Sequence, residues 1–153
     1  MSSNATEILS GLWIGDKISV NDESFLMNKQ IEVIINCSND RKTPDYPIIK
    51  MKYYIHLNSN DNMRRSELCQ ILDKYCDLIK FCINSKNILV YCDTGNIHSP
   101  LLIVMFLMKY VGLDPTTIQK LLQTKRPSIG PCFSSHGQLL HFYQNRGNPG
   151  RGN

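Results

Sequence analysis

The feature that most constrains the fold is a pair of apolar segments joined by a short loop, between residues 88 and 110. Residues 88–91 form an apolar run typical of a buried central strand, and residues 99–110 form a longer apolar run. The loop between them is mostly polar and contains Gly95. This order predicts a buried strand, a tight turn and a buried helix, which is the local arrangement of an α/β protein.

The rest of the chain alternates in the same way between strand-like and helix-like segments. Strands are expected near residues 12–14, 31–35 and 51–57, and helices near residues 23–28, 66–84 and 134–143, with a further helix that opens with Asp114 and Pro115. A chain of 153 residues is long enough for one domain and too short for two. We therefore predict one three-layer α/β domain over residues 1–145, followed by a flexible tail over residues 146–153.

Composition narrows the range of partners. The net charge of +4 suits an anion-binding surface but is too small to argue for nucleic acid. The six cysteines form no Cys-x2-Cys pair and no Cys/His cluster at zinc spacing, so we expect neither a metal nor another cofactor. Several of these cysteines lie in apolar runs, which predicts a reducing compartment: the cytoplasm, with the nucleus or a virion left open. The longest apolar stretch is too short to cross a membrane, so no membrane partner is expected.

The loop after residues 88–91 is the best candidate for a functional site. A strand, a glycine-containing loop and a helix N-terminus direct several backbone N–H groups toward one point, where a phosphate or sulfate ion can bind. Cys92 begins this loop, so the same N–H groups should lower its thiol pKa. The alternative is that Cys92 only ends a buried strand, since buried cysteines are common.

Three motifs in the same order resemble the dual-specificity phosphatases of the protein tyrosine phosphatase superfamily. Residues 92–99 resemble the signature Cys-x5-Arg-Ser/Thr. Residues 126–133 and 137–142 resemble the closing segment of that family, and residues 8–15 and 34–38 resemble its opening strand and the strand after it. The resemblance covers nearly the whole chain and implies the family's fold, a central, mostly parallel twisted sheet with helices on both faces.

The resemblance also implies roles for individual residues. Cys92 matches the nucleophile, and Ser99 matches the hydroxyl that helps the thiolate leave from the phosphoenzyme. Gly95 matches the glycine that lets the loop close on phosphate. The residues expected to surround the phosphate are Asp93, Thr94, Gly95, Asn96, Ile97 and His98.

The general acid of the family is an aspartate on a loop roughly thirty residues before the cysteine. Asp61 lies at 92 − 61 = 31 residues before it, which makes it a candidate. An alignment on the preceding strand, however, places Ser59 at that position, and Asp61 is then a solvated loop residue. Both assignments stay open.

Two departures from the family pattern predict impaired catalysis. His98 stands where the family has arginine, and Tyr91 stands where the family has a histidine before the nucleophile. Arginine holds two phosphoryl oxygens with a permanently charged fork, whereas histidine donates one useful bond and is mostly neutral above about pH 6.5. The weakened contacts amount to about 3–6 kcal/mol, or roughly 10² to 10⁴ in rate.

These features favour a pseudophosphatase that binds a phosphoprotein or another protein partner. A second hypothesis is a slow but active phosphatase, in which His98, Arg65 or Arg126 substitutes for the missing arginine. A third is a purely structural or oligomerising protein that reuses the fold. The residue at position 98 disfavours the enzyme, and the presence of Cys92, Gly95 and Ser99 weighs against a purely structural role.

Overall fold

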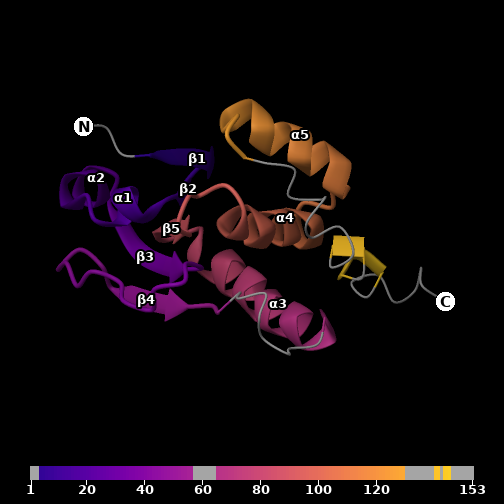
Figure 1. Ribbon diagram of the computed structural model, residues 1–153, viewed down its shortest axis with the longest axis horizontal. Helices are drawn as coiled ribbons and strands as arrows, with labels where there is room; N and C mark the ends of the chain where they lie inside the picture. Colours follow the sequence, from indigo (N-terminus) through magenta and orange to yellow (C-terminus); the bar gives the residue numbers. More distant parts are fainter. Residues whose placement is uncertain (1–3, 57–64, 130–139, 142, 146–153) are drawn as a thin grey trace.

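The computed structural model describes residues 4–56, 65–129, 140–141 and 143–145 (Figure 1). Most of the helix expected over residues 134–143 therefore lies outside the described residues, although residues 140–141 and 143–145 are helical. The tail predicted over residues 146–153 lies outside them as well. Within the described part of the chain, no helix is both long enough and apolar enough to cross a membrane.

A five-stranded sheet forms the centre of the domain, in the order β1-β2-β5-β3-β4. Its strands are β1 (Ala5–Leu9), β2 (Leu12–Gly15), β3 (Ile31–Asn36), β4 (Met51–Tyr54) and β5 (Asn87–Tyr91). Among the described residues, only the β1–β2 pair is antiparallel, and the other three pairs are parallel. The prediction of a mostly parallel sheet is confirmed, with β5 as its central strand.

Helices cover both faces of this sheet, so the predicted three-layer architecture is also confirmed (Figure 1). One face carries α3 (Arg65–Cys82) and α4 (His98–Tyr110), and α5 (Pro115–Lys125) packs on α4 and β1. The other face carries two short helices, α1 (Lys17–Val20) and α2 (Glu23–Asn28).

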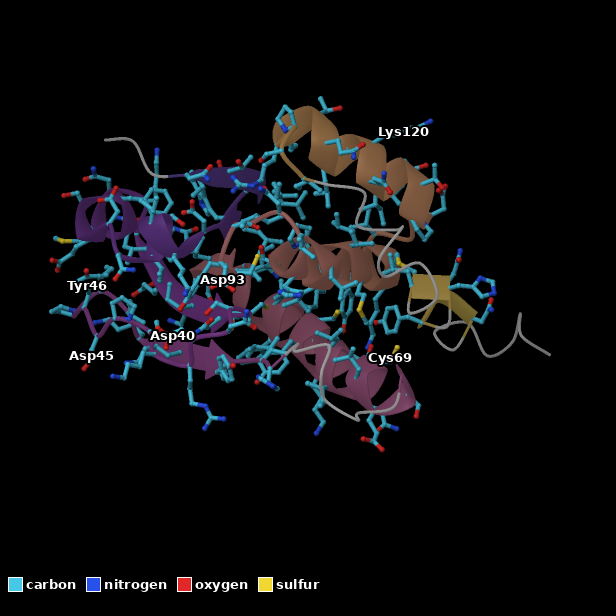
Figure 2. All side chains as sticks on the ribbon, viewed as in Figure 1. Asp40, Asp45, Tyr46, Cys69, Asp93 and Lys120 are labelled. Carbon is cyan, nitrogen blue, oxygen red and sulfur yellow. The ribbon has the colours of Figure 1, made fainter. Side chains whose placement is uncertain are left out.

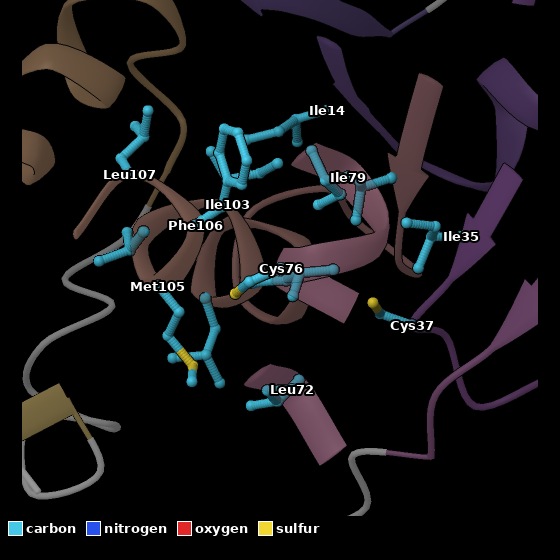
Figure 3. Close-up of a cluster of buried hydrophobic side chains, with 14 of the residues drawn as sticks. Ile14, Ile35, Cys37, Leu72, Cys76, Ile79, Ile103, Met105, Phe106 and Leu107 are labelled. Carbon is cyan, nitrogen blue, oxygen red and sulfur yellow. The ribbon is translucent and has the colours of Figure 1, made fainter. Parts of the chain in front are cut away.

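Two hydrophobic clusters, one on each face, hold the layers together. The larger cluster joins the sheet to α3 and α4 through side chains such as Ile35, Ile79 and Ile103, all fully buried (Figure 3). The smaller cluster lies under α1 and α2. Because side chains alternate along a strand, β5 contributes Val90 to the larger cluster and Tyr91 to the smaller one. The residue that follows, Cys92, again belongs to the larger cluster, on the α4 side.

The structure contains two elements that the sequence pattern did not predict. β1 is an edge strand in which only Ile8 is fully buried, so it lacks the apolar alternation of a core strand. α1 is a single turn, too short for helical periodicity, and it depends on its N-cap: the Asp16 carboxylate accepts a hydrogen bond from the Ser19 N–H at 2.9 Å. β4 ends at Tyr54, whereas a strand was expected to residue 57, which lies outside the described residues.

Candidate functional site

The site lies at the edge of the sheet where the parallel strands end. β5 ends at Tyr91, residues 92–97 form the loop, and α4 begins at His98. The neighbouring strands enclose the start of the loop: the Cys92 N–H donates to the Gly15 oxygen (3.2 Å), and the Cys37 N–H donates to the Tyr91 oxygen (2.7 Å). The carboxyl ends of parallel strands are the usual place for a ligand in an open α/β sheet.

Cys92 is buried, and its surroundings nevertheless lower the pKa of its thiol. Burial alone would raise the pKa of the thiol, but hydrogen bonds from the Ser99 hydroxyl and from the N–H groups at the start of α4 outweigh this effect and lower the pKa. The Gly95 N–H also donates to Cys92 Sγ at 3.1 Å, and Ser99 Oγ lies 3.3 Å from the same sulfur. The structure therefore brings Cys92 and Ser99, two residues of the candidate site, together.

The N-terminus of α4 directs further backbone N–H groups toward this point. Ile97 is the N-cap residue, and its apolar side chain cannot accept a hydrogen bond from the first turn. The first N–H groups of a helix have no partner within the helix, and here they point toward Cys92 instead of toward a capping side chain. A helix N-terminus in this state favours an anion.

Gly95 makes the tight loop possible. Its φ is +76°, a conformation that side chains other than glycine rarely adopt. A Cβ at this position would lie 2.5 Å from Arg126 Nη2 and 2.8 Å from the Gly15 oxygen, closer than real Cβ contacts. Glycine is thus required both by the backbone conformation and by the lack of space.

Arg126, one of the residues considered as a substitute for the missing arginine, lies behind the loop and donates its hydrogen bonds to the protein. Its side chain is buried, with 4% of its surface exposed, behind the loop. Arg126 Nε donates to the Gly95 oxygen (3.0 Å) and Nη2 donates to the Thr94 oxygen (3.2 Å). The guanidinium therefore bonds to the carbonyl oxygens of the loop. A phosphate would lie on the opposite side, facing the loop N–H groups.

The polar side chains of the loop form contacts within the protein. The carboxylate of Asp93, which is labelled in Figure 2, forms a salt bridge with Lys17 (2.9 Å). It also accepts a hydrogen bond from the Asn39 N–H (3.3 Å), which joins the loop to the segment after β3. Thr94 Oγ1 accepts from the Asn96 N–H (3.2 Å). Asn96 Oδ1 accepts from Arg126 Nε and from the Ser128 hydroxyl. An anion in the loop would therefore bind mainly to backbone N–H groups.

His98 is the first residue of α4 and is partly buried. Burial lowers the pKa of its imidazole below the ordinary value of 6.5, while the nearby Asp93 carboxylate opposes this shift. His98 is therefore largely neutral at pH 7, so the position where the family has a permanent cation carries little charge.

Tyr91 has a structural function that the sequence did not reveal. Its ring is buried in the cluster under α1 and α2, on the sheet face opposite Cys92. Its hydroxyl lies 3.2 Å from Thr43 Oγ1, and Asn36 Nδ2 donates to the same Thr43 oxygen. Tyr91 thereby joins β5 to the segment between β3 and β4. A cavity of about 370 Å³, lined in part by Tyr91 and Lys17, opens beside this segment.

The expected general-acid position and the side chain of one candidate arginine lie outside the part of the chain that the structure describes. Asp61 and Ser59, the two alternatives for the general-acid position, fall outside the described residues, as does the side chain of Arg65. Among the side chains that the structure describes, no three His, Cys, Asp or Glu residues come together in a way that could hold a metal ion.

Comparisons with known proteins agree with this architecture. The sequence model of the family "Dual specificity phosphatase, catalytic domain" matches residues 12–145. Dual specificity protein phosphatase 8 of Mus musculus is 29% identical over 142 residues, which cover 92% of this chain. The match covers only 21% of that relative, so this chain spans about a fifth of its length.

Two solved structures share the fold. A mouse putative dual specificity phosphatase, crystallised as a complex with zinc tungstate, superposes with a TM-score of 0.84 at 17% identity, over 99% of this chain and 92% of that chain. The human tyrosine phosphatase-like serine/threonine/tyrosine-interacting protein gives a TM-score of 0.77 at 18% identity, over 92% and 96% of the two chains. Together with the match over residues 12–145, the observed sheet and loop establish that this chain belongs to the dual-specificity phosphatase catalytic domain family.

Proposed function

We propose that this protein is a catalytically impaired member of its family that binds phosphorylated protein through the loop at the end of β5. The observation that carries the proposal is the state of His98, a partly buried imidazole whose pKa is lowered by burial, at the position where the family has arginine. A neutral imidazole donates one hydrogen bond, whereas a guanidinium fork donates two with a full charge. Histidine in place of arginine weakens stabilisation of the phosphoryl-transfer transition state most, because that state carries charge on several equatorial oxygens.

Binding depends on different groups, which the loop retains. The N–H of Gly95 and the first N–H groups of α4 point at Cys92, and a phosphate above the sulfur would meet the same donors. Neither of these contacts involves the side chain at position 98. The impaired loop can thus hold a phosphoryl group while turning it over slowly.

The first expected result is near-background hydrolysis of an aryl phosphate by the wild-type protein at neutral pH. The missing contacts correspond to about 3–6 kcal/mol, a loss of roughly 10² to 10⁴ in rate. Hydrolysis of p-nitrophenyl phosphate, compared with Cys92→Ser, measures this loss. Fluorescence anisotropy with a phosphotyrosine peptide and its unphosphorylated twin measures binding in parallel, and only the phosphorylated peptide should bind.

A slow but active phosphatase is the second candidate, and the state of Cys92 favours it. The lowered pKa of this thiol and the Ser99 hydroxyl beside it are the features that a nucleophile needs. The same assay separates the two candidates: robust turnover that Cys92→Ser abolishes would identify an enzyme. If neither turnover nor phosphopeptide binding occurred, both candidates would be wrong and a structural role would remain.

Phosphate affinity is expected to rise as the pH falls below 6.5. The folded-state pKa of His98 lies below this value, so the imidazole gains its charge only under mildly acidic conditions and attracts the anion there. By linkage, bound phosphate must raise the His98 pKa, which NMR titration of the ring protons measures directly. Asp93→Asn serves as the control, because loss of the Asp93 charge should lower the His98 pKa in the free protein. A His98 pKa that stays unchanged at saturating phosphate would show that His98 does not face the anion.

A further inference from the structure

Arg126 is the C-cap residue of α5, 31 residues beyond Gly95 in the sequence, and its side chain lies directly behind the loop. In addition to its bonds to the Thr94 and Gly95 oxygens, Nη1 donates to Thr6 Oγ1 on β1 at 3.0 Å. The guanidinium thus joins α5, β1 and the loop, and all of its hydrogen-bond acceptors among the described residues are neutral oxygens. A buried cation that donates only to neutral oxygens is costly unless anions nearby compensate for it, and the buried Asp16 carboxylate is one such anion.

One peptide group connects this cation to Cys92. The Thr94 carbonyl and the Gly95 N–H belong to the same planar peptide unit. Arg126 Nη2 donates to the oxygen of this unit at 3.2 Å, and the N–H of the same unit donates to Cys92 Sγ at 3.1 Å. A charged donor on the carbonyl oxygen polarises the amide and strengthens the hydrogen bond on its other side. Arg126 therefore acts on the sulfur through the peptide, without touching it.

We propose that Arg126 is a positioning residue for the phosphate loop: its buried guanidinium fixes the Thr94–Gly95 peptide with the N–H toward Cys92 and provides, from behind the loop, positive charge that His98 does not provide. The inference rests on the proposed function in taking this loop as the phosphate site. The electrostatics agree with the geometry, because attraction to Asp16 and to the Cys92 thiolate opposes the lowering of the Arg126 pKa by burial. Asp16 is the larger of these two attractions, and the Cys92 thiolate adds to it.

The test replaces Arg126 with methionine, which keeps an unbranched chain and removes the charge, and with lysine, which keeps a charge but lacks the fork. The Cys92 titration is followed by thiolate absorbance near 240 nm, with Cys92→Ser in each background subtracted. Arg126→Met should move the midpoint of the Cys92 titration up by about one pH unit, which is a tenfold loss of thiolate at a given pH. The midpoint of Arg126→Lys should lie between those of the wild type and Arg126→Met. Lys120→Met, an exposed cation on the same helix, is the control and should change nothing.

A second measurement tests the consequence for binding. Isothermal titration with inorganic phosphate should show about tenfold weaker affinity in Arg126→Met, because the Gly95 N–H is no longer held toward the anion. Should Arg126→Met fail to fold, Arg126→Lys and Arg126→Gln provide the same comparison. A folded variant without charge at position 126 whose Cys92 midpoint equals that of wild type would overturn the proposal. Absence of phosphate binding by the wild type would instead refute the proposed function, and the Cys92 midpoint would still decide the role of Arg126.

Discussion

Replacing Gly95 with alanine is expected to lower the free energy of unfolding by about 3 kcal/mol, of which roughly 1 kcal/mol comes from the positive φ. The remainder comes from crowding. The new Cβ would lie 2.5 Å from Arg126 Nη2 and 2.8 Å from the Gly15 oxygen, and the latter belongs to a backbone fixed in the sheet. Arg126 must then withdraw, and its charged hydrogen bonds to the loop, worth about 1.5–3 kcal/mol, are lost or weakened.

Gly112 provides a matched control for this prediction. Its φ is +78°, nearly the same as at Gly95, but a Cβ built there would meet no atom within 4 Å. Gly112→Ala should therefore cost only the conformational penalty, about 1 kcal/mol. Urea denaturation of the two variants measures the difference, which isolates the crowding against Arg126 and Gly15. Equal losses in the two variants would mean that the loop relaxes without cost and that Arg126 does not hold it.

The same substitution should also alter the chemistry of the site. Once the loop moves, the Gly95 N–H no longer reaches Cys92 Sγ, and the Cys92 pKa should rise. Gly112→Ala should leave this pKa unchanged, because Gly112 lies at the far end of α4, after Tyr110. Gly95→Ala is therefore expected to change both the free energy of unfolding and the Cys92 pKa, whereas Gly112→Ala should change only the free energy of unfolding.

The parts of the fold that could be predicted are those in which local pattern and burial agree. β3, β5 and α4 are mainly apolar because most of their residues are buried, and α2 has the predicted range, residues 23–28. β1 and α1 escaped prediction because an edge strand and a single helical turn bury too little to leave a periodic signal. Their positions depend on pairing with β2 and on the Asp16 cap.

In the candidate site as well, the residues of one local segment could be named from the sequence, whereas contacts between distant segments could not. Cys92, Gly95 and Ser99 could be named as candidates because one contiguous segment supplies them and resembles a known signature. The burial of Arg126 could not be predicted, because an isolated arginine is normally exposed and the carbonyl oxygens that it bonds to are presented only by the folded loop. Tyr91 was recognised as a departure from the family, but its bond to Thr43 joins residues 48 apart and could not be inferred from the sequence.

The His98→Arg substitution is expected to tighten binding of a phosphotyrosine peptide by roughly 10²-fold, equivalent to about 2–3 kcal/mol. The guanidinium restores a permanent charge and a two-pronged donor at the N-terminus of α4, where His98 is largely neutral. His98→Lys tests charge without the fork, and His98→Gln tests a neutral donor. The expected order of affinity is arginine, then lysine, with glutamine close to the wild type.

Turnover by His98→Arg should rise above that of the wild type but stay below that of an ordinary enzyme of this family. Tyr91 still occupies the position of the family's histidine, and it lies in the cluster on the sheet face opposite Cys92. Adding Tyr91→His should increase the rate further. It should also reduce stability, because the buried ring and its hydrogen bond to Thr43 are lost.

The leaving group separates the contribution of position 98 from that of the general acid. A good leaving group such as p-nitrophenolate needs little protonation, so restored charge at position 98 should benefit its ester most. A phosphopeptide has a poorer leaving group, and without an effective acid its hydrolysis should remain slower by about 10². The ratio of the two rates in His98→Arg, compared at one pH with Cys92→Ser as the blank, measures this deficit. If His98→Arg hydrolysed both substrates at the rate of an ordinary dual-specificity phosphatase, an effective acid would already be present, and the change at position 98 would account for the whole loss of catalysis.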